Sequence, residues 1–235
     1  MAPVSEYLDV SDPAALPAAV DRARTVLGDR GCIVLPTDTV YGIGADAFSP
    51  TAVAVLLAAK GRGRSMPPPV LMADRAVMAG LAYDAPEQAE QLAERFWPGA
   101  LTLILKSQPT LTWDLGETRG TVALRVPADP VTREVLYAVG PMAVSSANRT
   151  GMPAATTAQA AREMLGDAVS LYLDGGERTE CAPSTIVDCT VTPFRVARQG
   201  AVSLEELREV VPDLVAEGEE PPVPADRRAP GLPEG

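Results

Sequence analysis

The sequence predicts an α/β fold with a twisted mixed sheet and flanking helices. Short apolar runs alternate along the chain with segments in which apolar residues recur at helical spacing, and this alternation favours a layered α/β structure. Towards the end, the strand-like runs 184–188 and 194–198 follow each other without an intervening helix, which predicts that the sheet is mixed. The 235 residues are 46% hydrophobic, enough to bury a full core.

The first half of the chain is expected to begin with a helix at 12–31, which glycines at its end would stop. The short apolar run 32–35 before Pro36 predicts a buried strand. Ser49 followed by Pro50 is a typical helix start, since serine caps the first turn and proline fits its first position. The other predicted elements of this half are a helix to residue 60, a strand at 70–72, helices at 74–81 and 86–96, and a strand at 101–106.

The second half continues the pattern, with predicted strands at 121–126, 141–146, 169–173, 184–188 and 194–198, and predicted helices at 130–139, near 157–165 and from Ser203. Glu206 stands three residues after Ser203, which is the spacing of a capping box. Residues 218–235 contain many prolines and glycines. We therefore expect one domain over residues 1–211 and a disordered tail over 212–235.

Composition excludes several classes of function. Histidine is absent, which rules out Ser-His-Asp and Cys-His catalysis and histidine metal sites. The net charge of −11 opposes strong nucleic-acid binding, so direct binding of a nucleic acid is expected to be weak or absent. Three cysteines without C-x-x-C spacing fit a reducing compartment. With no signal-peptide pattern and no long apolar segment, we expect a cytoplasmic protein without a membrane partner.

Two segments place polar side chains where a sheet would open into a cleft. The turn at 37–39 follows a buried strand, and open α/β sheets bind ligands at strand ends, although the same residues also suit a plain tight turn. Lys60, Arg62 and Arg64 are three cations in five residues, and together they suit a polyphosphate. Basic residues also favour helix C-termini for dipole reasons, so both interpretations stay open.

Two later segments have the same character. Ser145, Ser146 and Asn148 follow a predicted strand and offer hydroxyl and amide groups to phosphate oxygens, or form an ordinary turn. Ser184 begins another predicted strand, and Arg198 before a glycine suits a nucleotide phosphate or a surface charge.

Taken together and in this order, these segments resemble the YrdC-like threonylcarbamoyl-AMP synthase family in its short, single-domain form. The matching pieces are P-T-D-T-V-Y-G at 36–42, K-x-R at 60–62, S-x-N at 146–148, S-T-I-V-D at 184–188 and R-x-G at 198–200, and the resemblance covers about residues 12–211. It implies a YrdC-like sheet with a central cleft. The implied catalytic residues are Lys60, Arg62, Ser146 and Asn148; the implied threonine site is Thr39, Arg125, Val144 and Ser184; the implied ATP site is Lys60, Arg62, Thr121, Ser146, Asn148 and Arg198.

The resemblance also implies a reaction that makes threonylcarbamoyl-AMP and pyrophosphate from L-threonine, bicarbonate and ATP, for threonylcarbamoyladenosine at tRNA position 37. Mg²⁺ would arrive with ATP, no protein side chain would bind a metal, and a downstream tRNA threonylcarbamoyl-transfer enzyme would take the product. Met66 and Leu71 stand where the family often has Asn and His, and loop 61–69 has the Gly and Pro content of a lid. A carbamoyl-transfer domain and an RNA-binding module remain the alternatives.

Overall fold

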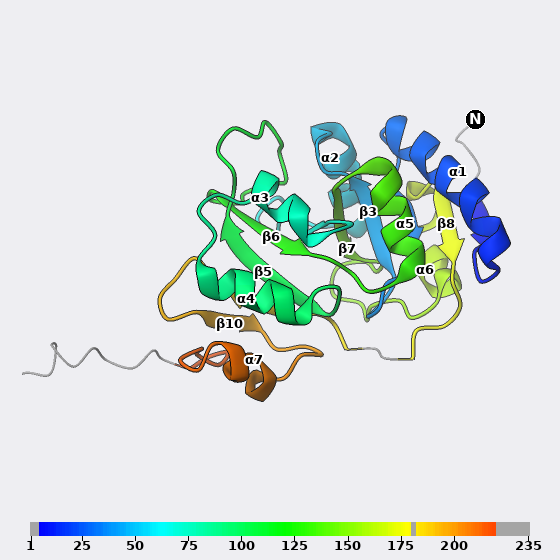
Figure 1. Ribbon diagram of the computed structural model, residues 1–235. Coiled ribbons are helices and arrows are strands. Elements are labelled where there is room, and N and C mark those ends of the chain that lie inside the picture. Colours follow the sequence, from blue (N-terminus) through cyan, green and yellow to red (C-terminus); the bar gives the residue numbers. More distant parts are fainter. Residues whose placement is uncertain (1–4, 180–181, 220–235) are drawn as a thin grey trace, which may run out of the picture.

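The computed structural model describes residues 5–179 and 182–219 (Figure 1). Its strands are β1 (Glu6–Asp9), β2 (Ile33–Leu35), β3 (Gly42–Asp46), β4 (Val70–Leu71), β5 (Leu101–Lys106), β6 (Thr121–Arg125), β7 (Met142–Ser146), β8 (Leu171–Asp174), β9 (Thr185–Asp188) and β10 (Arg195–Arg198). Its α-helices are α1 (Leu16–Gly28), α2 (Pro50–Lys60), α3 (Met78–Leu81), α4 (Glu87–Phe96), α5 (Pro130–Val139), α6 (Ala158–Leu165) and α7 (Leu204–Val210). Short 3-10 helices occupy Pro13–Ala15, Arg75–Val77 and Gly166–Ala168.

The strands of the described residues form a single sheet in the order β1-β8-β2-β3-β7-β4-β6-β5-β9-β10. The pairs β1–β8, β8–β2, β4–β6 and β5–β9 are parallel. The pairs β2–β3, β3–β7, β7–β4, β6–β5 and β9–β10 are antiparallel. The predicted mixed sheet is therefore confirmed, and the antiparallel pair β9–β10 is formed by the two runs that predicted it.

Helices cover both faces of this sheet, which is why β2 is apolar at every position. On one face, α1 and α5 pack together and share a core with side chains of β2, β7 and β8. The larger core includes side chains of α2, α4, α6 and α7. In Figure 1, α4 and α7 lie next to each other below β5.

Local signals explain where the helix next to the cleft begins and ends. The Ser49 hydroxyl accepts a hydrogen bond from the Ala52 amide, and Pro50 occupies the first turn of α2. Gly61 ends the helix with φ +61°, a left-handed conformation that glycine adopts without strain. Lys60 and Arg62 therefore stand on either side of a fixed turn.

Two differences from the sequence prediction lie near the ends of the described chain. β1 was not expected, because a four-residue edge strand with half-buried alternate positions carries little pattern. Leu214 and Val215 are buried and Val215 pairs with Arg195, so the domain extends beyond the expected boundary at 211. The rest of the predicted tail, 220–235, lies outside the described residues.

The two cysteines in the described part of the chain, Cys32 and Cys189, are buried and unpaired, and Cys181 lies outside it. Burial raises the pKa of the Cys32 thiol to about 12, so this cysteine is an inert core residue. Within residues 5–179 and 182–219, each helix is too short or too polar to cross a bilayer.

Candidate active site

A cleft of about 330 Å³ opens on the part of the sheet that runs from β7 to β10. The turn after β2, the end of β7 and Arg62 contribute one side, and β5, β6, β9 and Arg198 contribute the other. The cleft is lined by Thr37, Thr39, Val40, Tyr41, Gly42, Arg62, residues 67–69, Leu71, Thr102, Ile104, Leu115, Thr118, residues 121–123, Arg125, residues 144–146, Ala154, Pro183, Ser184, Ile186 and Arg198.

Strand register gives the cleft an apolar floor. Ile104 on β5 lies opposite Ala123 on β6, and Thr102 on β5 lies opposite Ile186 on β9. Residues in register point to the same face of a sheet, so these side chains form one surface in the cleft. Such a surface suits a flat apolar ring, with polar groups around it to fix orientation.

Two loops, residues 64–69 and 114–118, also contribute to the lining of the cleft, and we call them the roof loops. The Glu117 amide donates to the Arg64 carbonyl oxygen at 2.8 Å, and the Arg64 guanidinium pairs with Asp114 at 2.8 Å. Gly116, at φ +107°, lies so close that a Cβ built on it would be 2.6 Å from the Arg64 carbonyl oxygen. The loop proposed as a lid is therefore joined to a second loop.

Three guanidinium groups face the cleft: Arg62, Arg125 and Arg198. Burial lowers the pKa of Arg62, and burial together with the charges of Arg125 and Arg62 lowers the pKa of Arg198. Arg62 and Arg198 are thus partly desolvated, and the neighbouring charges of Arg125 and Arg62 add to the cost of holding Arg198 charged. An anionic ligand in the cleft would offset this cost through charge-assisted hydrogen bonds.

Arg125 is held by contacts from two separate segments. Its Nη2 donates to Asp38 Oδ1 at 2.7 Å and its Nη1 to the Thr39 hydroxyl at 3.2 Å. Its Nε donates to the Gly99 carbonyl oxygen at 2.9 Å. The guanidinium plane is therefore fixed before any ligand arrives, which suits bidentate binding of a carboxylate.

Arg198 holds the other end of the cleft. Its Nη2 donates to the Ser184 carbonyl oxygen at 2.7 Å and to the Ser184 hydroxyl at 3.2 Å. That hydroxyl also bonds to the Thr102 hydroxyl at 2.9 Å. The β9–β10 register shifts between Val196 and Arg198, and such an irregularity re-aims the side chains that follow it.

Lys60 and Asn148 stand behind the cleft wall. The Lys60 ammonium donates to the carbonyl oxygens of Ser146 and Asn148, the second at 2.7 Å, and Lys60 is only 3% exposed. Burial, followed by the charge of Arg62, lowers the pKa of Lys60 to about 8. The Asn148 amide nitrogen donates to the carbonyl oxygens of Arg149 and Met152. Both side chains thus shape the turn after β7.

The predicted site residues therefore converge, with different roles for individual members. Lys60 contacts Ser146 and Asn148, and Arg62 donates to the Ser145 hydroxyl at 2.9 Å. The predicted residues that line the cleft are Thr39, Arg62, Thr121, Arg125, Val144, Ser146, Ser184 and Arg198, whereas Lys60 and Asn148 do not line it. Of the two residues that stand where the resembled family often has Asn and His, Leu71 lines the cleft, whereas Met66 is 42% exposed and does not line it.

Sequence reasoning missed several residues of the cleft. Asp38 does not line the cleft but holds Arg125, and its place in the turn at 37–39, which was singled out, could have indicated it. Leu115 and Thr118 come from the loop 107–120, whose sequence has no periodic pattern. Among the residues that the structure describes, no three His, Cys, Asp or Glu side chains gather as a metal site.

Comparison with known proteins identifies relatives of the whole domain. The family model of Sua5, YciO and YrdC, described as "Telomere recombination", matches residues 25–200. A protein of Mycobacterium tuberculosis, named provisionally as a threonylcarbamoyl-AMP synthase, is 49% identical over 208 residues, which are 88% of this chain and 96% of that protein. The threonylcarbamoyl-AMP synthase of Pyrococcus abyssi is 36% identical over 77% of this chain and 54% of its own length.

Solved structures show the same fold. Sua5 of P. abyssi in complex with L-threonine superimposes with a TM-score of 0.82 at 31% identity, over 91% of this chain and 62% of that chain. HypF of T. kodakarensis matches with a TM-score of 0.67 at 18% identity, over 79% of this chain and 24% of that chain, and this likeness concerns the fold alone. The predicted α/β fold with a YrdC-like sheet is thereby confirmed.

Proposed function

The chain belongs to the Sua5, YciO and YrdC family, and from this membership we propose that it is a threonylcarbamoyl-AMP synthase. The proposed reaction joins L-threonine, bicarbonate and ATP into threonylcarbamoyl-AMP and pyrophosphate, for threonylcarbamoyladenosine at tRNA position 37. The observation that carries this proposal is the cleft itself, in which Arg62, Arg125 and Arg198 surround a partly apolar floor. A nucleotide polyphosphate next to an amino-acid carboxylate matches that combination of charge and surface.

We propose that the two substrates occupy different ends of the cleft. Arg125, which Asp38 and Thr39 hold in place, would bind the carboxylate of threonine beside the Val144 backbone, and Ser184 would complete this site where it adjoins Arg198. Arg62 and Ser146 would bind the phosphates, with Thr121 and Arg198 on the nucleotide. Lys60 and Asn148 would act on the phosphates through the backbone of the turn after β7.

The proposed chemistry needs no protein nucleophile. The threonine amine adds to CO2 derived from bicarbonate and loses a proton, which gives a carbamate. A carbamate oxygen then attacks the α-phosphorus of ATP, and the bond from that phosphorus to the bridging oxygen breaks as pyrophosphate leaves. The cleft would hold both reactants in line and exclude water, which would otherwise decompose the carbamate. The guanidinium of Arg62 would stabilise the charge that develops on the phosphates.

We further propose that ATP enters as its Mg²⁺ complex, since the divalent cation neutralises the charge of the leaving pyrophosphate. Because a mixed anhydride of a carbamate and a phosphate hydrolyses readily, a tRNA threonylcarbamoyl-transfer enzyme would have to take the product directly. We expect this transfer of the product to take place in the cytoplasm. We also expect direct tRNA binding by this chain to be weak.

Threonine-dependent release of pyrophosphate tests the function. Purified protein with Mg²⁺, ATP and bicarbonate should release pyrophosphate when threonine is present and little when it is omitted. A carbamoyl-transfer domain would use carbamoyl phosphate and need no threonine. An RNA-binding module would release no pyrophosphate and would retain RNA on a filter at moderate salt.

A further inference from the structure

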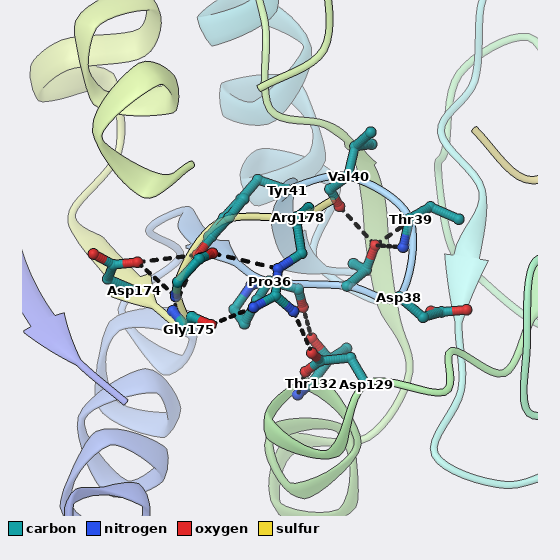
Figure 2. Close-up of polar contacts among 12 residues, drawn as sticks. Pro36, Asp38, Thr39, Val40, Tyr41, Asp129, Thr132, Asp174, Gly175 and Arg178 are labelled. Carbon is teal, nitrogen blue, oxygen red and sulfur yellow. Dashed lines mark hydrogen bonds and ion pairs between the residues drawn. The ribbon is translucent and has the colours of Figure 1, made fainter. Parts of the chain in front are cut away.

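A second polar network joins the turn at 37–41 to α5 and to the end of β8 (Figure 2). It joins three segments that are far apart in the sequence: the turn itself, the first turn of α5 and the residues after β8. Its members are Pro36, Tyr41, Asp129, Thr132, Asp174, Gly175, Gly176 and Arg178.

An ion pair forms the centre of this network. Arg178 Nη1 donates to Asp129 Oδ2 at 3.0 Å, and the two side chains are 19% and 6% exposed. Arg178 also donates to the carbonyl oxygens of Gly175 and Gly176. The other oxygen of Asp129 accepts from the Thr132 amide at 2.9 Å and caps α5. Burial raises the pKa of Asp129, and the Thr132 amide and Arg178 oppose that shift.

The network holds the turn at both of its ends. The Thr132 hydroxyl donates to the Pro36 carbonyl oxygen, where the turn begins. At the other end, the Tyr41 hydroxyl lies 2.7 Å from the Gly176 carbonyl oxygen and accepts from the Gly175 amide at 3.0 Å. The Arg178 guanidinium also lies over the Tyr41 ring, 5.7 Å from its centre. Both ends of the turn are thus fixed to the pair of Arg178 and Asp129.

Between these fixed ends, the turn presents the side chains that hold Arg125. Asp38 and Thr39 make two of the contacts of its guanidinium. A shift of the turn would therefore move the group proposed to bind the threonine carboxylate, and the proposed nucleotide contacts of Arg62 and Ser146 come from other segments. A displacement of about 1 Å can lower reactivity by two orders of magnitude.

The recess beside the network does not provide a second anion site. It measures about 180 Å³ and is lined by residues 37–39 and 177–179. Asp38 and Glu177 line it together with Arg178, and Arg178 already pairs with Asp129, so the recess has no excess of positive charge. The network is better explained as support for the turn than as a binding site.

We propose that Arg178 and Asp129 are positioning residues for the threonine end of the cleft. They act through the turn at 37–41 and Arg125 and touch neither substrate. The proposal rests on the synthase function proposed above, and it predicts a selective effect on one of two substrates that share a cleft.

The test is steady-state kinetics of Arg178→Gln and Asp129→Asn, with threonine and ATP varied separately. We expect the KM for threonine to rise roughly tenfold and the KM for ATP to change less than twofold. Arg178→Lys keeps the charge and loses the planar guanidinium group, so its KM for threonine should lie between those of the wild type and Arg178→Gln. The matched control is Arg22→Gln, which removes a surface pair with Glu6 at 2.6 Å and should leave both KM values unchanged.

Equal rises in both KM values, or an unchanged KM for threonine, would overturn the proposal. If Arg178→Gln does not fold, Thr132→Val removes only the donor to the Pro36 carbonyl oxygen and should raise the KM for threonine about threefold. An unchanged value there would also overturn it. A wild-type protein that releases no pyrophosphate contradicts the proposed function, whereas an active wild type with an unaffected Arg178→Gln variant contradicts this inference alone.

Discussion

The two faces of the turn at 37–41 differ in how their charges are balanced. On the cleft face, Arg62, Arg125 and Arg198 gather, and the one ion pair that these three form among the described residues is with Asp38. On the rear face, Arg178 is paired with Asp129, and the surrounding hydroxyls and carbonyls bond to one another. Each face combines buried and partly exposed groups: Arg125 and Asp129 are buried, and Arg62 and Arg178 are half-buried.

This difference indicates which face is built for a ligand. Partly desolvated cations that lack an ion-pair partner, here Arg62 and Arg198, reduce stability, and a protein keeps them where a bound anion supplies the missing charge. A balanced network instead fixes geometry without a ligand. Substitutions on the two faces should therefore differ in their effect on stability. Loss of a cleft cation that lacks an ion-pair partner should lower activity and leave the stability of the fold unchanged or higher. Loss of Arg178 or Asp129 should lower both activity and stability.

The largest effect is expected for Arg62→Gln. We expect kcat to fall about a hundredfold, because a positive charge is lost next to the phosphates. The melting temperature should stay the same or rise, because burial lowers the pKa of Arg62 and its charge is therefore costly in the folded protein. Pyrophosphate release and thermal unfolding measure the two quantities. A variant with lost activity and a large fall in melting temperature would remove the distinction between the two faces.

Lys60→Met should lower turnover roughly tenfold, because the carbonyl oxygens of Ser146 and Asn148 lose their shared donor. The substitution should also change how the unfolding free energy depends on pH. Burial, followed by the charge of Arg62, lowers the pKa of Lys60 from its ordinary value of 10.5 to about 8 in the folded chain. Between these values the unfolded chain binds more protons, so the unfolding free energy of the wild type should rise with pH.

The difference in unfolding free energy between the wild type and Lys60→Met should rise above pH 8 by at most about 1.4 kcal/mol per pH unit. Below pH 8 this difference should not change with pH. Denaturant titrations of both proteins at pH 7, 8, 9 and 10 measure the difference. If the unfolding free energies of the two proteins change with pH in the same way, the Lys60 ammonium is not desolvated in the folded chain.

Gly116→Ala tests the roof loops. A Cβ at this position would meet the Arg64 carbonyl oxygen and force a side chain into a positive φ, so the two loops should separate. We expect a loss of about 1–3 kcal/mol in unfolding free energy and a rise of a few-fold in the KM for ATP. An unchanged KM despite lower stability would show that the roof does not contribute to nucleotide binding.

The smallest effect is expected for Arg64→Gln. Its ion pair with Asp114 is exposed, and the backbone hydrogen bond from Glu117 to Arg64 remains in the variant. Kinetic constants and melting temperature should match those of the wild type. A loss comparable to that of Arg62→Gln would indicate that Arg64 also reaches the phosphates.

The fold was largely predictable from the sequence because its signals are local. The Ser49–Pro50 start and the Gly61 stop of α2 follow from capping chemistry, and both were found. The capping box of Ser203 and Glu206 was also found. β1 escaped prediction because its pairing with β8 is formed with residues more than 160 positions away.

The sequence predicted which residues belong to the site better than it predicted where their side chains lie. The segments around Arg62, Ser146 and Ser184 do line one cleft. That Lys60 instead faces the backbone depends on how α2 packs against β3, the neighbour of β7 in the sheet, and no local pattern predicts this packing. The pairing of Arg178 with Asp129, 49 positions apart, likewise exists only in the folded chain.

The most direct measurement is mass analysis of the product formed with ¹³C-labelled bicarbonate. If the cleft holds a threonine carbamate next to ATP, the wild type should yield threonylcarbamoyl-AMP with the label in its carbamoyl carbon, and Arg62→Gln should yield far less. Consumption of ATP without a labelled threonine adduct, or undiminished product from Arg62→Gln, would contradict the account.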